Sequence, residues 1–436
     1  MKPTKPLSFF FPHDQRVKVA LNLTVRGRLF TPEGLREGWV RISGGWIEEV
    51  GRELPPEGEV LDFRGKGKVI LPGLIDMHVH LRDFRLSYKE DFRTGTRAAA
   101  RGGYTVVVDM PNTLPRVNTL SVLRRRENLG RRRAVVDFGL YFGVPERREE
   151  LKKEIGRRCL GIKVYLPEEG GKETLEDTLS FAAREKLLVV AHAEDPALFR
   201  KGGERPPEAE AAGIRRMAEF SLKHGFRLHL THLSSSVGLE ELERWRGKLR
   251  LSADTCPHYL LLTHRHGRNP LARVFPPLRG PRDRIALLRG IREGKIEAIT
   301  SDHAPHSLQE KREPDGPGGF PGLETELPLL LTLVRKGRLT LGEVVRSCSF
   351  HPALLLGLPA GRIERGCIGN LTVVDLEKSF RIDPSEFESK AKYSPFEGMR
   401  VTGAAFCTIV RGKPVFLEGR VEGGRGVNVK SYGEAW

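Results

Sequence analysis

Short runs of alternating apolar and polar residues fill the N-terminal part of the chain, from Val17 to Ile70. They read VALNLTVRGRLF, GWVRISGGWIEEVG and EVLDFRGKGKVILPG, and turn residues separate them. Alternation with a period of two is typical of half-buried strands in small antiparallel sheets. The same pattern returns after about residue 365, in GCIGNLTVVDL and AAFCTIVRGKPVFLEG. We therefore expect a small β-sandwich domain built from both termini.

The middle of the chain alternates apolar runs with charged, amphipathic stretches. The apolar runs include YTVVVDM (104–110), AVVDFGLYFG (134–143), GIKVYL (161–166), LLVVAHAE (187–194), RLHLTHL (227–233), LRLSADTC (249–256) and IEAITSDHA (296–304). Helical candidates such as YKEDFRTGTRAAARGG and GIRRMAEFSLKHG stand between them. Alternating strands and helices predict an α/β fold with a parallel sheet, and close to eight such units favour a closed, TIM-like (β/α)8 barrel over an open sheet.

These patterns divide the chain into four segments. The length of 436 residues suits a barrel of roughly 250 residues with a smaller companion domain. We expect an N-terminal extension at 1–16, the first part of the β-sandwich at 17–70, the barrel at 71–365 and the second part of the sandwich at 366–436.

Composition narrows the class of protein. The net charge of +17 could attract a polyanion, but the basic run RRRENLGRRR (124–133) has no interleaved aromatic residues and belongs to no nucleic-acid module. We interpret this run as an exposed helix and expect no nucleic-acid partner.

The five cysteines are far apart and form no CxxC pair, which predicts buried, reduced thiols. With no apolar stretch of about 20 residues and no secretory signal, the sequence predicts a cytoplasmic protein without a membrane span.

Polar residues that end the apolar runs are the candidates for chemistry, because active-site side chains of such barrels come from the C-terminal ends of strands. They are His78, His80, Asn112, Lys163, His192, His232, Asp254 and Asp302. Imidazole and carboxylate groups are ligands that suit zinc. His78 and His80 are two residues apart, so both project from the same face of a strand. The sequence therefore predicts a metal site.

Other histidines receive a different interpretation. His229 is three residues before His232, so the two face opposite sides of a strand, and we assign His229 to packing. His264 and His266 stand in a basic, glycine-bearing loop and are expected to be exposed, whereas a structural role is expected for His258. Lys163 is ambiguous on its own, since an ammonium group would repel a dication.

The ordered motifs resemble those of the dihydroorotases of the cyclic amidohydrolase superfamily. They are HVHLRD, KEDFRTGTRAAARGG, DMPNTLP, GIKVYL, VVAHAE, THLSS, TSDHAPH and GGFPGLETELPLLL, and they run from about residue 70 to 360. The resemblance implies two Zn²⁺ ions bridged by a hydroxide and by an N6-carboxylated Lys163. It implies that one ion is bound by His78, His80 and Asp302 and the other by His192 and His232; Asp254 matches an acidic position of some members.

The resemblance also implies a reaction, the reversible cyclisation of N-carbamoyl-L-aspartate to L-dihydroorotate in pyrimidine biosynthesis. In that reaction Asp302 is the catalytic proton shuttle. The residues implied in substrate binding are His80, Arg82, Asn112, His306, Gly318 and Gly319. A homodimer and an association with aspartate carbamoyltransferase are both compatible with the family.

Two features leave alternatives open. An allantoinase or a hydantoinase would share the metal ligands, although a ring without an exocyclic carboxylate would leave Arg82 and Asn112 with nothing to bind. The sequence also departs from many relatives, which have Pro-Gly soon after the arginine of the HLR motif and an Asn before the paired prolines. This chain has Asp83-Phe84-Arg85 and Phe275 at those places.

Overall fold

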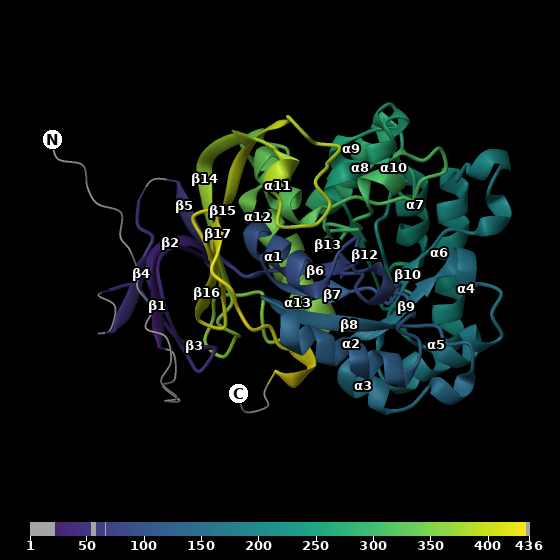
Figure 1. The fold of residues 1–436 in the computed structure, drawn as a ribbon, viewed down its shortest axis with the longest axis horizontal. Coiled ribbons are helices and arrows are strands. Elements are labelled where there is room, and N and C mark those ends of the chain that lie inside the picture. The colour runs from purple at the N-terminus through teal and green to yellow at the C-terminus, as the bar shows by residue number, and fades with distance from the viewer. Residues whose placement is uncertain (1–21, 54–57, 66, 433–436) are drawn as a thin grey trace.

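Two β-sheets organise the computed structural model, which describes residues 22–53, 58–65 and 67–432. Figure 1 shows a sheet of strands from both ends of the chain on one side and a helix-covered barrel on the other. The predicted N-terminal extension, residues 1–16, lies outside the described residues.

The first sheet is mixed and has nine strands, in the order β17-β16-β15-β14-β5-β1-β2-β3, with β4 paired to β1. The strands are β1 (Leu23–Thr31), β2 (Gly34–Ser43), β3 (Trp46–Gly51), β4 (Glu59–Asp62), β5 (Lys68–Pro72), β14 (Leu371–Arg381), β15 (Arg400–Val410), β16 (Lys413–Leu417) and β17 (Arg420–Val421). The two ends of the chain meet where β5 pairs antiparallel with β14. This confirms a β-domain built from both termini, and all of its strands belong to one hydrogen-bonded sheet that branches at β1.

The second sheet confirms the predicted barrel. Its eight strands are all parallel to their neighbours, in the order β6 to β13. They are β6 (Leu74–Val79), β7 (Tyr104–Asp109), β8 (Asp137–Gly143), β9 (Gly161–Tyr165), β10 (Leu188–His192), β11 (Arg227–Leu230), β12 (Leu251–Thr255) and β13 (Ala298–Ile299). The first and last strands meet through a parallel bridge between Val79 and His303, and the His80 N–H donates to the His303 carbonyl oxygen over 2.8 Å.

Helices cover the outside of the barrel (Figure 1). They are α1 (Phe92–Gly102), α2 (Leu120–Arg133), α3 (Glu154–Arg158), α4 (Leu166–Glu169), α5 (Thr174–Arg184), α6 (Pro207–His224), α7 (Ser236–Trp245), α8 (Pro257–Leu261), α9 (Pro281–Arg292), α10 (Leu308–Arg312), α11 (Leu323–Arg335), α12 (Leu341–Val345) and α13 (His351–Leu356). In α1, the Asp91 side chain accepts the Thr94 N–H at the first turn, and Gly103 ends the helix with a φ of 90° that favours glycine. No helix in the described part of the chain is long and apolar enough to cross a membrane.

The basic run at 124–133 falls on α2 and is not wholly exposed. Arg126 is fully buried, and its guanidinium forms ion pairs with Asp83 (3.0 Å) and Asp109 (2.7 Å). These contacts fix the loop after β6 against the end of β7.

The five cysteines are free and buried, as expected.

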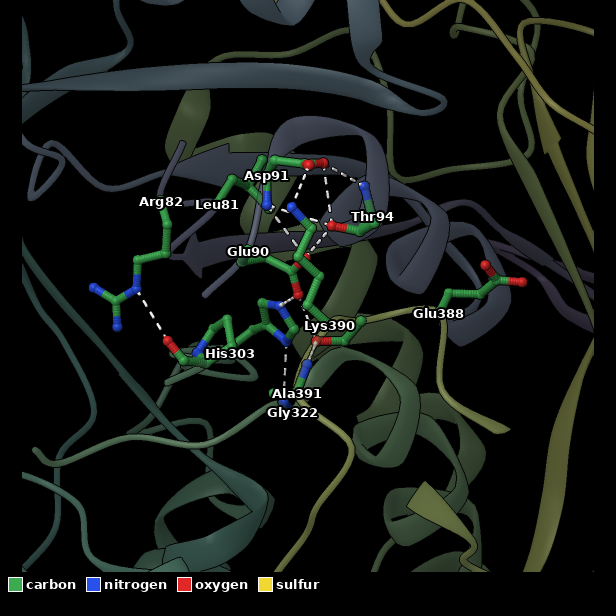
Figure 2. Close-up of polar contacts among 12 residues, drawn as sticks. Leu81, Arg82, Glu90, Asp91, Thr94, His303, Gly322, Glu388, Lys390 and Ala391 are labelled. Carbon is green, nitrogen blue, oxygen red and sulfur yellow. Dashed lines mark hydrogen bonds and ion pairs between the residues drawn. The ribbon is translucent and has the colours of Figure 1, made fainter. Parts of the chain in front are cut away.

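A long connection between β14 and β15, which we call the 382–399 segment, reaches from the mixed sheet to the loop after β6. Lys390 Nζ donates to Asp91 Oδ2 and to the Ser87 carbonyl oxygen, both over 2.6 Å, and Figure 2 shows Lys390 beside Asp91. The Ser389 hydroxyl donates to Glu90. The 382–399 segment is therefore anchored on the loop that follows β6.

Candidate metal centre

The first group of predicted ligands comes together at the end of β6 and just after β13. Nε2 of His78 and Nε2 of His80 each lie 3.4 Å from Oδ1 of Asp302. One ligand atom from each of the three residues lies within 4.8 Å of the others. This spacing allows the three side chains to bind one metal ion.

The second group adjoins the first. His192 Nδ1 lies 3.0 Å from His232 Nε2, and the ring centroids of His78 and His232 are 5.2 Å apart. Lys163 is the third of the five residues of β9 and donates from Nζ to Thr231 Oγ1 over 3.3 Å. Burial lowers the pKa of Lys163 to about 8. The structure thus gathers all six predicted ligands at one end of the barrel.

The chemistry of this cluster fits divalent metal ions. Nδ1 of His78 and Nδ1 of His232 are buried, and neither has a hydrogen-bond partner within the described residues. Burial lowers the pKa of both imidazoles well below its usual value, so both are neutral at physiological pH. A histidine must be neutral to bind a metal, and four imidazoles with a carboxylate form a donor set suited to zinc.

Two of the ligand candidates have an unusual backbone. His232 and Asp302 have φ values of 43° and 46°, in the left-handed region that non-glycine residues rarely adopt. Such a conformation costs on the order of 1–3 kcal/mol and persists only where the surroundings enforce it. The fully buried Asp254 enforces it at His232, because its Oδ1 accepts the His232 N–H over 2.7 Å. Asp254 therefore positions a ligand candidate through its backbone.

The structure also shows where the remaining histidines discussed from the sequence lie. Asp254 Oδ2 lies 2.9 Å from His229 Nε2, and His229 Nδ1 lies 2.8 Å from the Ser252 hydroxyl, so His229 is a packed residue as expected. His264 and His266 are exposed, as expected for the loop that carries them. His258 is buried against Tyr259 and Phe320.

Two positioning residues were missed from the sequence. Glu194 Oε2 lies 2.7 Å from His192 Nε2 and accepts a hydrogen bond from Arg205 over 2.8 Å. Asp76 Oδ1 accepts the His78 N–H over 2.9 Å. Each of these carboxylates is two residues from the histidine that it contacts. Residues two apart on a strand face the same side, so the spacing rule that paired His78 with His80 also predicts both contacts.

The predicted substrate residues lie beside the metal-ligand candidates. Arg82 is buried, donates from Nε to the Pro305 carbonyl oxygen over 3.2 Å, and has its Nη2 3.1 Å from His306 Nε2. Among the described residues it forms no ion pair. Asn112 is exposed, and its Oδ1 lies 2.6 Å from His80 Nδ1. The His80 Nδ1–H therefore donates to Asn112, which leaves Nε2 of His80 free to face Asp302.

The glycine-rich loop packs tightly at both of its predicted glycines. A Cβ at Gly318 would lie 2.6 Å from the ring of Phe275, and one at Gly319, with φ of 117°, would lie 2.6 Å from the Ala304 carbonyl oxygen. Glycine is required at both positions by these close approaches. The Phe275 ring also stacks on Arg205, whose Cζ is 3.9 Å from the ring centroid. Phe275 therefore packs between the glycine-rich loop and Arg205.

The fold and the site define a class of protein. The amidohydrolase family model matches residues 69–415, and the chain belongs to this family of metal-dependent hydrolases. The protein is similar to the dihydroorotase of Pyrococcus furiosus, with 38% identity over 92% of this chain and 94% of the relative, and to that of Methanothermobacter thermautotrophicus, with 37% identity over 89% and 93%. A solved structure, the L-hydantoinase (dihydropyrimidinase) from Arthrobacter aurescens, shares 29% identity with a TM-score of 0.87 and covers 93% of this chain and 99% of its own.

Proposed function

We propose that the protein is a dihydroorotase that interconverts N-carbamoyl-L-aspartate and L-dihydroorotate. The observation that carries this proposal is the buried guanidinium of Arg82, which forms no ion pair within the described residues and lies beside the candidate metal ligands. A substrate that bears a carboxylate next to the reacting ring would neutralise it. The dihydroorotase relatives, at 33–38% identity, support the same reaction.

A buried cation without a counter-ion is costly, which is why Arg82 stands out. Arg126 is buried as well, but it faces two carboxylates, from Asp83 and Asp109. Removing a charge from water is offset only when a partner of opposite charge and good geometry is present. A planar guanidinium presents paired donors that match a carboxylate, so the missing partner of Arg82 has the chemistry of a substrate carboxylate.

The candidate metal centre supplies the chemistry of ring opening. His78, His80, His192, His232, Asp302 and a carboxylated Lys163 would hold two Zn²⁺ ions, and bound metal would supply Lewis-acid chemistry that polarises the ring carbonyl and acidifies a water. Lys163 gains the required negative charge when its neutral amine adds CO2 and releases a proton. That addition resolves the repulsion between a lysine ammonium and a dication.

The remaining residues orient the substrate and move its proton. Arg82 and His306 hold the carboxylate, and Asn112, fixed through His80, presents its amide NH2 group to the substrate. Asp302 accepts the proton of the attacking water and delivers it to the ring nitrogen as the amide bond breaks. In the direction of ring closure the same carboxylate takes the proton from the ureido nitrogen.

A hydantoinase-type activity is the alternative, since the solved structure of an L-hydantoinase has the same fold over nearly the whole chain. Such an enzyme would need no cation at position 82. The two activities are distinguished by turnover of the metal-loaded protein on dihydroorotate, dihydrouracil, hydantoin and allantoin. We expect ring opening of dihydroorotate with the highest kcat/KM, and a preference for any of the uncharged rings would reject the proposal.

A further inference from the structure

We propose that Lys89 is a positioning residue that fixes the tautomer of His306, so that the Nε2–H of this histidine donates to the substrate carboxylate. This inference rests on the proposed function. Lys89 begins the KEDFRTGTRAAARGG motif, but the resemblance gives this lysine no role in substrate binding.

The geometry places His306 between two cations. Lys89 Nζ lies 3.1 Å from His306 Nδ1, and Arg82 Nη2 lies 3.1 Å from His306 Nε2. Both His306 and Lys89 are largely removed from solvent, with side-chain exposures of 9% and 11%. The imidazole therefore has a permanent donor at each of its two nitrogens.

These two contacts conflict in the free protein. An ammonium and a guanidinium can only donate, whereas a neutral imidazole has one N–H and one accepting nitrogen. Burial lowers the pKa of His306, and the charges of Arg82 and Lys89 lower it further, so the ring is neutral. Only one of the two cations can donate to the ring at any time, and the other faces an N–H.

A carboxylate resolves the conflict. If Lys89 donates to Nδ1, the ring proton must reside on Nε2, which then points at Arg82. An anion that enters between Arg82 and His306 accepts from both groups at once. Lys89 thus determines which nitrogen of His306 carries the proton, and it does so without touching the substrate.

The surroundings hold Lys89 in place for this role. Glu310 Oε1 lies 2.9 Å from Lys89 Nζ and accepts the Tyr88 hydroxyl over 2.8 Å. On the opposite side, the Tyr393 hydroxyl of the 382–399 segment accepts the His306 N–H over 3.3 Å. The His306 backbone and the Lys89 ammonium are therefore both anchored before a substrate arrives.

A simple ion pair between Lys89 and Glu310 is the competing explanation, and Lys390 provides the control for it. Lys390 contacts the same loop, donates to Asp91 and to the Ser87 carbonyl, and does not contact His306. Lys390→Met removes the same charge and a loop anchor. Lys89→Arg retains a donor for Nδ1 and serves as the rescue variant.

The test compares Lys89→Met, Lys89→Arg and Lys390→Met with the wild type in two measurements. The first is kinetics on dihydroorotate and on dihydrouracil, the same ring without the carboxylate. The second is calorimetric binding of orotate, a planar ring with the same carboxylate. For Lys89→Met we expect KM for dihydroorotate and Kd for orotate to rise about tenfold or more, kcat to stay within about twofold, and dihydrouracil kcat/KM to stay unchanged. Lys89→Arg should recover most of the loss.

The outcomes distinguish the role of Lys89 from the dihydroorotase proposal. Equal effects of Lys89→Met and Lys390→Met, or an equal loss on dihydrouracil, would overturn the role of Lys89 while leaving the dihydroorotase proposal intact. If the wild type binds orotate, Lys89→Met weakens this binding and the wild type does not open dihydroorotate, the reaction is rejected and the positioning role is retained. Failure of the wild type in both measurements would reject both.

Discussion

Nε2 of His303 lies 3.4 Å from Oε2 of Glu90, and both side chains are fully buried (Figure 2). The Gly322 N–H donates to His303 Nδ1 over 3.2 Å, so the ring proton resides on Nε2 and faces the Glu90 carboxylate. His303 follows Asp302 directly, and its carbonyl oxygen accepts the His80 N–H. Glu90 therefore tethers the backbone that connects two of the metal-ligand candidates.

Glu90→Ala should destabilise the protein and weaken metal binding. It removes the acceptor for Ser389 and Thr94 and leaves the buried His303 Nε2–H without an acceptor, and leaving a buried donor without its partner typically costs about 1–3 kcal/mol. Glu90→Gln keeps an acceptor of the same shape and should lose less. The measurements are the melting temperature and the zinc content after dialysis, and an Ala variant that matches the wild type in both would contradict the role of Glu90.

Arg82→Met should lower the activity and raise the melting temperature of the substrate-free protein. Loss of a charged hydrogen-bonding partner worth roughly 1.5–3 kcal/mol lowers kcat/KM on dihydroorotate by about 10- to 100-fold. The melting temperature of the substrate-free protein should rise, because the variant no longer buries an unpaired cation. The matched control is Arg126→Met, which leaves Asp83 and Asp109 without their cation and should melt earlier than the wild type. A lower melting temperature for both variants would show that Arg82 is structural.

Lys163→Ala should reduce metal binding from two ions to one. In the proposed site, a carbamate formed from the lysine amine and CO2 would bridge the ions, so loading of the wild type with the second ion should depend on bicarbonate. Metal content is measured by mass spectrometry after reconstitution with zinc, with and without bicarbonate. Retention of two ions and of full activity in the Ala variant would remove Lys163 from the site.

Lys311, which is not a metal-ligand candidate, should contribute a pH dependence of stability. Its ammonium is fully buried and donates to the carbonyl oxygens of Arg273 (3.0 Å) and Pro317 (2.9 Å), which hold the glycine-rich loop. Burial lowers its pKa from 10.5 to about 7. Between these values the unfolded chain binds more protons than the folded one, so the contribution to stability is present above pH 10.5 and is lost as the pH falls through 7.

The corresponding variant is Lys311→Met. The free energy of unfolding of the wild type should rise relative to this variant as the pH increases from 7 to 10, by at most about 1.4 kcal/mol per pH unit. Urea denaturation at several pH values measures this difference. A constant difference across that range would show that the amine does not titrate differently in the two states.

The barrel and the cluster of ligand candidates could be predicted because both follow from local patterns. Each of His192, His232 and Asp302 comes at or just after the end of an apolar run, and the topology of a parallel barrel brings such ends together. The alternating pattern at both termini likewise led to a shared β-domain. These inferences need only the period of the pattern and the direction of the strands.

The residues that escaped prediction depend on contacts between distant parts of the chain. Glu90 stands in a charged stretch that is typical of a solvent-exposed helix start, yet it is buried and contacts His303 and Ser389, the latter 299 positions later in the chain. Arg126 belongs to a basic run of the same kind. Lys89 gains its role from His306, 217 positions away. No local period encodes such pairs.

The contacts of the 382–399 segment bear on whether the barrel can be produced without the mixed sheet. A truncated chain that ended with the last barrel helix would retain every ligand candidate and every barrel strand, yet it would lose the Ser389 hydroxyl from Glu90 and the Tyr393 hydroxyl from the His306 N–H. An isolated barrel would therefore lack two hydrogen bonds that anchor Glu90 and the His306 backbone beside the metal-ligand candidates, so the connection between β14 and β15 is a structural part of the proposed site.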